Sequence, residues 1–369
     1  MLKLLRLFGG LLSKLYQSEA WRVSMESITV LITGAGAPGA PGVIKSLRDN
    51  GERSIRVVGV DASKEAVGFK LVDAGCQIPK ADAPDFTSSL LKIAGEEKVD
   101  VILPLVTMEL ETLSLNKDKF QNEGIIVSVS DIYPLKIANN KGKLLAYMKD
   151  KGLSVSLFSI VNSKIEFMKS AYELGYPDKP ICFKPLNSNG SRGFRIIDPK
   201  INRHKLLFDT KPTLTYITFD EVMSIFEESE IFIPLILMEY LPGNEYSVDL
   251  LVDHGRPLYT IPRRRDAMSA GITTKGVIIK EDDVINYCNE IVQNLKLHGN
   301  IGIQVKRDMN NIPLILEINP RIQGSIVHCT GAGVNLPYYA VKLALKEEVP
   351  KVCVKWNCKM LRYWKEVFY

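Results

Sequence analysis

Short β-branched runs alternate with helical segments from Ser27 onward, and this alternation constrains the fold more than any other feature. The runs SITVLITG, IRVVGVD and VDVILPL have strand length, and residues 41–48 and 86–97 between them have helical periodicity. A further strand, GIIVSVS, completes the set. Such a strand–helix–strand rhythm is typical of a parallel sheet. We therefore predict a Rossmann-like α/β domain over residues 28–130.

Antiparallel strands dominate the second half of the chain. A helix over residues 139–153 opens it, and the runs PICFKPL and FRIID read as one hairpin. The runs FIPLILMEYL, EYSVDLLVD and RPLYTIP are expected to form a later antiparallel set. A helix over 280–296 then leads into a last hairpin, NIGIQVKRD with IPLILEINP, and into a final helix over 336–346. We expect an α+β domain over residues 131–348, with a separate lobe at about 150–240.

Composition excludes several classes of protein. The chain has 369 residues, 46% hydrophobic and 24% charged, as in soluble globular proteins of two or three folded units. A net charge of +5 without a basic stripe argues against a nucleic-acid partner. The six cysteines form no CxxC pair, which favours a reducing cytoplasmic location.

The two ends of the chain stand apart from the predicted domains. Residues 1–27 are basic and weakly amphipathic, and they fit neither a signal peptide nor a transmembrane segment. An extension upstream of Met25 and a helix at a membrane interface are the two interpretations of this segment. Residues 349–369 form a C-terminal tail.

A glycine-rich loop, GAGAPG over residues 34–39, follows the first strand. With Asp61 at the end of the next strand, it has the spacing of a dinucleotide-binding fingerprint. However, Pro38 and Pro41 crowd the helix start that would receive a pyrophosphate. The loop is therefore interpreted first as a tight turn lining a substrate site, with a nucleotide site as the alternative.

The last hairpin allows a geometric prediction. If residues 310–311 form a two-residue turn, Gln304 lies directly opposite Glu317, and strand alternation places Asn319 on the same face. These oxygen donors suit Mg²⁺ or Mn²⁺, which usually also binds substrate phosphates. A solvent-exposed polar face is the alternative, although Glu317 lies within an apolar run.

Cationic side chains lie near the same elements. Lys184 ends an apolar strand directly before the loop NSNGSRG at 187–193, whose backbone N–H groups could fold over phosphate oxygens. Lys141 starts a helix, and Arg321 just after the last strand could neutralise a developing phosphoryl charge. For either lysine, an ordinary surface position is the alternative. The segment LMEYLPGNE over 237–245 could offer its backbone to an adenine and Glu245 to a ribose, or could be a hairpin with two exposed acids.

The order of these motifs resembles the ATP-grasp superfamily and looks closest to one synthetase half of the carbamoyl phosphate synthase large chain. The resemblance covers roughly residues 28–345, and EINPR after a Gln-bearing strand is its most specific signal. It implies a fold class that combines α/β and α+β parts: a Rossmann-like pre-ATP-grasp domain followed by a two-lobed ATP-grasp domain.

The resemblance also implies roles for individual residues. Arg263, Arg264, Arg265 and Lys275, in PRRRDAMSAGITTKG, would face the phosphate or the acid, with a solvated basic loop as the alternative. Metal ligands would be Gln304, Glu317 and Asn319, and catalytic residues would be Arg321, Lys184 and Arg265. Residues that bind ATP would be Lys141, Lys184, Ser188, Gly190, Ser191, Gly193, Glu239, Tyr240, Leu241 and Glu245.

The implied activity is that of an ADP-forming ligase that activates a carboxylate as an acylphosphate for capture by an amine. ATP and Mg²⁺ would be its cofactors, and a small acid and a small amine its substrates, within a possible homo-oligomer. A single ATP-grasp unit argues against making carbamoyl phosphate by two phosphorylations, and Asn187 and Asn189 depart from the glycine run of many related lids. The alternatives are an NAD-dependent oxidoreductase, a small-molecule kinase on the same fold and an ATP-sensing module.

Overall fold

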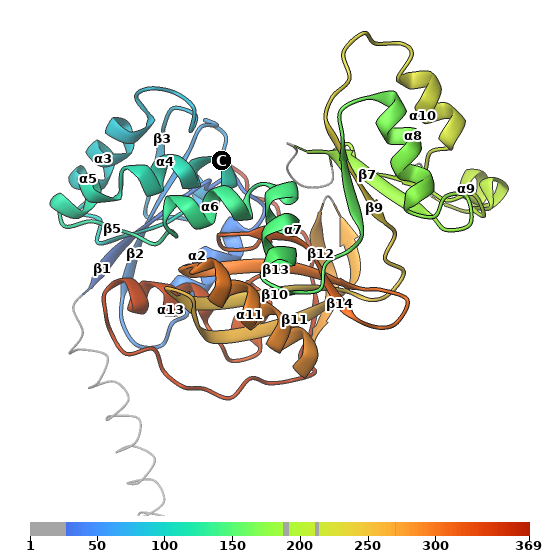
Figure 1. The fold of residues 1–369 in the computed structure, drawn as a ribbon. Coiled ribbons are helices and arrows are strands. Elements are labelled where there is room, and N and C mark those ends of the chain that lie inside the picture. Colours follow the sequence, from blue (N-terminus) through green and yellow to red (C-terminus); the bar gives the residue numbers. More distant parts are fainter. Residues whose placement is uncertain (1–26, 187–191, 211–213, 270) are drawn as a thin grey trace, which may run out of the picture.

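The computed structural model describes residues 27–186, 192–210, 214–269 and 271–369, which form three sheets (Figure 1). The N-terminal domain lies at the upper left of Figure 1, a lid lobe at the upper right, and a six-stranded sheet below both. The expectations for residues 1–26 and for Ser188, Gly190 and Ser191 lie outside the described residues. No helix in the described part of the chain combines the length and the apolar character needed to cross a bilayer.

The N-terminal domain is a parallel sheet covered by helices, as its strand–helix alternation predicts. Its strands lie in the order β3-β2-β1-β4-β5, and every pair is parallel. The strands are β1 (Ile28–Thr33), β2 (Ile55–Asp61), β3 (Ala74–Gln77), β4 (Val101–Leu103) and β5 (Ile126–Val127). The helices are α2 (Ala40–Arg48), α3 (Phe86–Glu96), α4 (Leu110–Leu115) and α5 (Lys117–Asn122), with 3₁₀ turns at Val67–Lys70 and Thr107–Glu109.

One face of this sheet does not have a core of its own. Val30 and Ile32 of β1 belong to a buried cluster that also contains Ile261 of the six-stranded sheet. Helix α2 packs between them, against α12 (Val327–Gly331) and α13 (Leu336–Ala344). The N-terminal domain and the six-stranded sheet therefore share one hydrophobic core.

The lid lobe is a four-stranded antiparallel sheet in the order β6-β9-β7-β8. Its outer face has a separate core that includes Phe167 and Phe183, whose rings meet edge to face at 5.3 Å. Two helices join the chain to this lobe, α6 (Ile132–Ala138) and α7 (Lys141–Asp150). The elements of the lobe are β6 (Phe158–Val161), α8 (Lys164–Glu173), β7 (Ile181–Pro185), β8 (Arg195–Ile197), α9 (Arg203–Asp209), α10 (Phe219–Ile225) and β9 (Leu235–Glu239).

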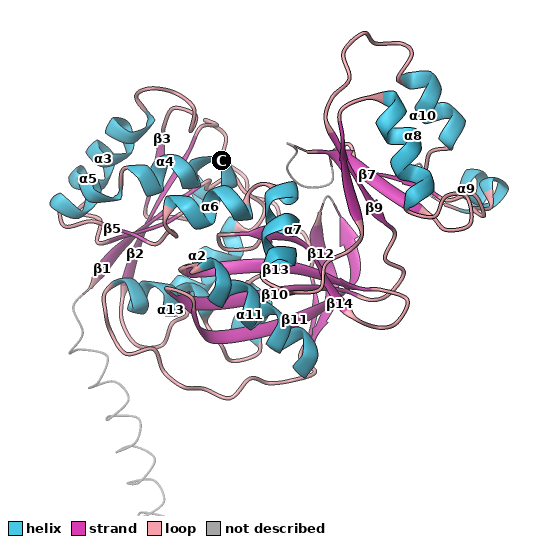
Figure 2. Cartoon of the chain, viewed as in Figure 1, coloured by secondary structure: helices cyan, strands magenta, loops and turns pink. Residues whose placement is uncertain are grey.

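The six-stranded sheet, drawn magenta at the centre of Figure 2, has the order β14-β13-β10-β11-β12-β15. Helix α11 (Asp282–Leu295) covers it. The strands are β10 (Glu245–Asp253), β11 (Arg256–Ser269), β12 (Ile272–Ile278), β13 (Gly299–Arg307), β14 (Pro313–Asn319) and β15 (Lys359–Leu361).

One expectation for these sheets is corrected. Strand β9 does not pair with β10; it pairs with β6 and β7, so the predicted three-stranded set is divided between two sheets. Alternation within one strand cannot reveal this division, because both sheets bury their strands in the same way. In the C-terminal tail, β15 adds a strand beside β12, and Lys70 of the N-terminal domain lies over the ring of Tyr369 at 4.4 Å.

A polar junction joins the N-terminal domain to the start of β13. The Ser130 hydroxyl accepts a hydrogen bond from the His298 backbone N–H at 2.8 Å and donates one to the His298 carbonyl at 3.0 Å. Burial, with the nearby His254 and Lys117, lowers the pKa of His298 to about 4. The imidazole of His298 is therefore neutral at neutral pH.

Candidate active site

A cavity of about 350 Å³ lies where the N-terminal domain, the lid lobe and the six-stranded sheet meet. The glycine-rich loop lines it through Ala37, Pro38 and Gly39, together with apolar side chains such as Leu105 and Leu186. The charged and amide side chains that line it are Asn139, Lys141, Lys184, Gln304, Glu317, Asn319, Arg321 and Gln323. The structure thus brings together residues that are far apart in the sequence.

The hairpin of β13 and β14 places the predicted oxygen donors on one face. Gln304 is the direct partner of Glu317, as predicted, and Gly302 is the partner of Asn319. The predicted two-residue turn is wrong. Residues 308–312 form a longer loop, capped by the Asp308 carboxylate, which accepts from the backbone N–H groups of residues 310 and 312. A register shift between residues 304 and 305 compensates for the longer loop and restores the pairing.

Glu317 contacts both a cationic and an amide side chain in the cavity. Its Oε2 lies 3.7 Å from the Lys184 ammonium, and its Oε1 accepts from the Asn319 amide at 3.3 Å. Lys184 is only 5% exposed, so the ordinary surface position considered for this residue is wrong. Glu317 and Asn319 are half-buried in the cavity wall, which also rules out a plain solvent-exposed face. The oxygens of Gln304, Glu317 and Asn319 form a hard donor set that fits a Mg²⁺ or Mn²⁺ ion.

Lys141 is the second ammonium in the cavity. It starts α7, and the preceding Asn140 caps this helix by accepting from the Lys143 N–H at 2.9 Å. Burial, together with the positive charge of Lys184, lowers the pKa of Lys141 to about 8. The two ammonium groups therefore face the same anionic space, and an added anion between them would relieve their mutual repulsion.

Arg321 lines the cavity beside the oxygen donors, just after β14. Its Nε donates to the Thr107 hydroxyl at 3.2 Å, and its Nη2 donates to the Asn319 side-chain oxygen at 3.3 Å. Burial lowers the pKa of Arg321, and Glu317 opposes that effect. Arg321 thus links the metal-ligand candidates to the loop after β4 in the N-terminal domain.

The glycine-rich loop is a tight turn packed against its surroundings. The Gly36 N–H donates to the Asp61 carboxylate at 2.8 Å, so Asp61 is already used within the fold. A Cβ atom on Gly39 would lie 2.6 Å from the Gly324 Cα, since the two backbones meet there. This geometry agrees with a tight turn that lines a substrate site. The Asp61 carboxylate binds the loop backbone and is therefore not free to bind the ribose of a dinucleotide.

The segment expected to contact adenine and ribose leaves β9 and enters β10. The Glu239 carboxylate accepts from the Leu157 N–H at 2.8 Å, and Lys306 lies over the Tyr240 ring at 4.7 Å. Leu241 is buried, and Glu245 pairs with Arg265. The two acids are therefore engaged rather than freely exposed. None of the four predicted residues of this segment is among the described residues that line the cavity: Glu239, Tyr240, Leu241 and Glu245.

Gly193 closes the loop that follows Lys184. Its φ of +70° is the left-handed conformation that glycine adopts without strain. A Cβ atom at this position would lie 2.5 Å from the Pro185 ring, next to Lys184. The end of the loop is therefore folded back onto the strand that carries Lys184.

The basic segment after residue 262 is not a loop. Arg263, Arg264 and Arg265 lie in β11 and Lys275 lies in β12, because the hairpin extends beyond the predicted strand. Each arginine also has a specific carboxylate partner: Arg263 pairs with Asp249, Arg264 with Asp266, and Arg265 with Glu245. A solvated basic loop is therefore excluded for the arginines.

Arg263 is completely buried, and its side chain reaches under the cavity. Besides its ion pair with Asp249, its Nη2 donates to the Gln323 side-chain oxygen at 3.3 Å. Gln323 lines the cavity, so Arg263 positions a lining residue and does not itself face the ligand space. The run of three arginines gave no signal for this role, because strand alternation alone does not say which of them is buried.

Sequence reasoning also missed Asn139, Thr107 and Glu109. Asn139 lines the cavity, and its side-chain oxygen is buried without a hydrogen bond. Glu109 is buried near Thr33 and Asp61, and burial is the main cause that raises its pKa to about 7. The position of these residues just after a parallel strand or at a helix end was the available signal.

Comparisons with known proteins agree with this architecture. Residues 30–128 match the model of the PylC-like N-terminal domain. Residues 231–365 match a model described as ATP-grasp in the biosynthetic pathway with Ter operon. The arginine-specific large chain of carbamoyl phosphate synthase from Bacillus subtilis is 22% identical over 255 residues, which cover 66% of this chain and 22% of that protein. The chain thus spans about a fifth of the length of this curated relative.

Solved structures give the same result at the level of the fold. The ADP complex of purK, an N5-carboxyaminoimidazole ribonucleotide synthetase, has a TM-score of 0.65 at 12% identity and covers 90% of this chain and 81% of its own. The chain has an ATP-grasp fold. A biotin carboxylase from Campylobacter jejuni, in complex with β-γ-ATP, has a TM-score of 0.62 at 17% identity, with 88% and 72% covered. The predicted resemblance and fold class are confirmed.

Proposed function

We propose that this protein is an ADP-forming ligase that activates a small carboxylic acid with ATP and joins it to an amine. The observation that carries the proposal is the cavity in which Lys184 lies 3.7 Å from Glu317, with Gln304 paired to Glu317. The two ammonium groups there are suited to bind the anionic triphosphate, and the oxygen donors are suited to bind a divalent cation. The similarity to ATP-grasp enzymes supports the same assignment.

Gln304, Glu317 and Asn319 would hold Mg²⁺ or Mn²⁺, which supplies charge neutralisation at phosphate oxygens when bound. Lys184 and Lys141 would bind phosphate oxygens from the other side. The segment Glu239–Leu241 would contact adenine and Glu245 the ribose, and Ser188, Gly190, Ser191 and Gly193 would cover the phosphates. These assignments are part of the proposal and follow the order of the motifs.

The reaction needs no nucleophile from the protein. A carboxylate oxygen of the acid attacks the γ-phosphorus, and the bond from that phosphorus to the β–γ bridging oxygen breaks, so that ADP leaves with the electron pair. The amine nitrogen then attacks the acyl carbon and loses a proton, and inorganic phosphate leaves. The chain contributes by positioning and by charge: Lys141, Lys184 and Arg321 neutralise the phosphoryl oxygens.

The glycine-rich loop and Thr107 form the part of the cavity that lies towards the N-terminal domain. We assign the acid to this side, where Arg321 and the loop backbone would orient its carboxylate. A cytoplasmic location and a homo-oligomeric state belong to the same proposal. They are supported by the cysteine content and by the resemblance, respectively.

The test is ADP release from Mg²⁺-ATP across a panel of amino acids and small acids, with and without an amine. The proposal expects release that requires both substrates and that is lost in Lys184→Ala and Glu317→Ala. Lys179→Ala, an exposed lysine of the same lobe, is the matched control and should retain activity.

Three outcomes would contradict the proposal. A stable phosphorylated acid without an amine would identify a kinase, and ATP binding without ADP release with any acid would identify a sensing module. Binding of NAD(H) without binding of ATP would identify the oxidoreductase.

A further inference from the structure

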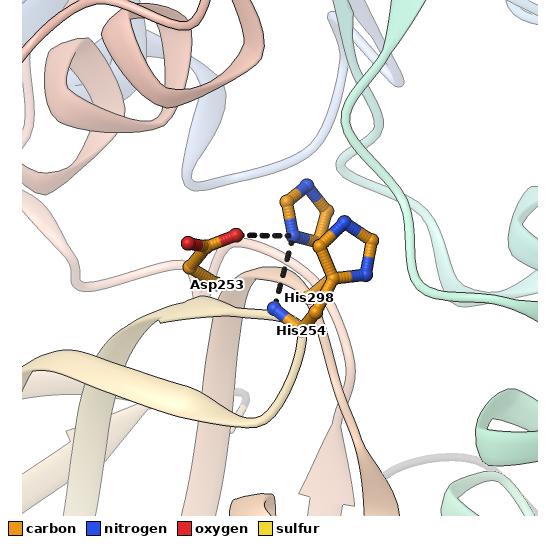
Figure 3. A group of neighbouring side chains, drawn as sticks. All are labelled: Asp253, His254 and His298. Carbon is orange, nitrogen blue, oxygen red and sulfur yellow. Dashed lines mark hydrogen bonds and ion pairs between the residues drawn. The ribbon is translucent and has the colours of Figure 1, made fainter.

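Two histidines and an aspartate meet at the turn between β10 and β11, as Figure 3 shows. One ligand atom from each of Asp253, His254 and His298 lies within 4.8 Å of the other two. The Asp253 Oδ1 is 3.9 Å from the His298 Nδ1, and the His254 backbone N–H donates to the same nitrogen at 3.3 Å. The His298 Nδ1 thus accepts one long hydrogen bond from the backbone, whereas the Asp253 Oδ1 lies beyond hydrogen-bond distance of it.

The cluster is separate from the cavity. Along β10, Asp253 is six residues from Ser247, the strand partner of Gln304. At about 3.3 Å per residue, the two places are roughly 20 Å apart. Nothing in the proposed ligase chemistry uses these three side chains.

The surroundings hold the cluster in place while leaving ligand atoms available. Arg256 donates to Oδ2 of Asp253 at 2.7 Å, which orients the carboxylate and leaves Oδ1 towards His298. The Ser130 hydroxyl holds the His298 backbone from both sides. Asp131, the next residue of the linker, pairs with Lys117 at 3.0 Å and also lies near His254 and His298. A second carboxylate is therefore near the cluster.

Imidazole nitrogens together with a carboxylate oxygen are ligands typical of zinc and of the neighbouring late transition metals, whereas Mg²⁺ prefers oxygen alone. The separation of 3.9 Å between Nδ1 and Oδ1 is below twice a metal–ligand bond of about 2.0–2.1 Å. An ion that bridges the two atoms would need only a small approach, and it would replace the hydrogen bond from the His254 N–H to this nitrogen.

One side chain must move to complete the site. The rings of His254 and His298 are stacked, with centroids 4.2 Å apart and planes at 24°, so one ion cannot lie in the plane of both rings as they stand. His254 is exposed, and rotation about its side-chain bonds is not blocked by packing. His298 and Asp253 are the half-buried, oriented pair to which a rotated His254 would add the third ligand.

We propose that Asp253, His254 and His298 bind a divalent transition-metal ion with the preferences of Zn²⁺, with Asp131 or water as the remaining ligand. The ion joins the β10–β11 turn, the start of β13 and the linker after the N-terminal domain. It acts as a structural tie at the junction of the N-terminal domain with the six-stranded sheet, independently of the Mg²⁺ expected in the cavity.

The hairpin turn offers a competing explanation for His254. This residue has a φ of +45°, a conformation that His, Asn and Asp tolerate better than most residues. His254→Asn keeps that tolerance and removes the imidazole, so it separates the turn from the ligand. His298→Gln likewise leaves the backbone contacts of Ser130 in place. His204→Asn, at an exposed histidine in α9, is the matched control.

The experiment measures Zn²⁺ binding to the full chain by calorimetry without nucleotide, and the absorption of bound Co²⁺ as a report on ligand type. We expect one equivalent of Zn²⁺, and a Co²⁺ spectrum of nitrogen and oxygen ligands without thiolate bands. His254→Asn and His298→Gln should each weaken binding about 10- to 100-fold or more, because loss of a ligand costs at least as much as loss of an outer-shell partner. His204→Asn and Glu317→Gln should bind as the wild type does.

Thermal unfolding gives a second readout. Zn²⁺ should raise the Tm of the wild type and of His204→Asn, because an ion that binds only the folded state stabilises it. It should leave the Tm of His298→Gln unchanged. Equal binding by the wild type and both cluster variants, thiolate bands in the Co²⁺ spectrum, or failure to bind one equivalent would each overturn the proposal. None of these readouts depends on ligase activity.

Discussion

On the sheet side of the cavity, the oxygen donors Gln304, Glu317 and Asn319 lie on two neighbouring strands of one ladder. On the lid side, Lys141 comes from the start of a helix and Lys184 from a separate sheet. The donors are thus fixed relative to one another by backbone hydrogen bonds. The ammonium groups are placed only by the packing of whole elements.

The hydrophobic cores show how the lid side is placed. In β7, Ile181 and Phe183 point into the separate outer core of the lid lobe, whereas Cys182 belongs to the core that includes α7 and β10. Alternation puts Lys184 on the same inner face as Cys182. Helix α7, which carries Lys141, supplies Leu144, Leu145 and Met148 to that inner core. Both ammonium groups are therefore held by one layer of packing between the two sheets.

If the oxygen donors of the sheet side and the ammonium groups of the lid side act together, removing either should cause nearly the whole loss of activity. We expect Glu317→Gln and Lys184→Met each to lower kcat for ADP release by about 10²- to 10³-fold, as for loss of a single transition-state contact. The double variant should be no more than slightly worse than the worse single variant, because groups that act together are not additive. Steady-state ADP release measures all three.

Lys179→Met, at an exposed position of the lid lobe, controls for the loss of a lysine. Thermal unfolding of each variant controls for folding, because Lys184 is buried. If the kcat losses of the two single variants multiply in the double variant, the sheet side and the lid side act independently, which would contradict this prediction.

The same contrast explains what the sequence could predict. Pairing of Gln304 with Glu317 follows from strand alternation and register within one hairpin, which are local properties. Even there the turn was wrong, and a register shift restored the predicted partner. The parallel N-terminal sheet is likewise local in origin, since each strand–helix repeat carries its own signal.

What the sequence could not show are contacts between distant elements. No local pattern places Lys184 against Glu317, assigns β9 to the lid sheet, or adds β15 to the edge of the six-stranded sheet. The order of motifs in the resemblance supplied the first of these. It did not reveal that Arg263 is buried under Gln323, because that position depends on the packing of β11 against the loop after β14.

The pH dependence of ATP affinity isolates the contribution of Lys141 on the lid side. Because the pKa of Lys141 is lowered to about 8, its charge is lost as the pH rises through 8. We expect ATP affinity to fall above pH 8 by at most about tenfold per pH unit. Lys141→Arg should give a flat profile over this range, because arginine stays charged. Equilibrium binding of ATP by the wild type and by Lys141→Arg, measured from roughly pH 6.5 to 9.5, tests both expectations, because this range spans the lowered lysine pKa.

The stability of the protein should change in the opposite direction. The folded-state pKa of Lys141 lies below its ordinary value of 10.5, so the unfolded state binds more protons between these values. The contribution of Lys141 to the free energy of unfolding therefore rises with pH from about 8 upward. Parallel decline of affinity and stability in the wild type would contradict this assignment, since it would indicate general unfolding at high pH.

Arg265 provides the smallest and most discriminating change. The resemblance assigns it a catalytic role, whereas the structure pairs it with Glu245 and places its Nη2 3.0 Å from the Gly271 carbonyl, which lines the cavity. If it acts by orienting Glu245 for the ribose, Arg265→Met should raise the KM for ATP roughly fivefold, about 1 kcal/mol, and leave kcat within about twofold. A loss of kcat with an unchanged KM would instead identify a contact made in the transition state. Because the side chain is nearly buried, Arg264→Met, which removes the exposed neighbouring arginine from the same strand, is the control for the fold of β11.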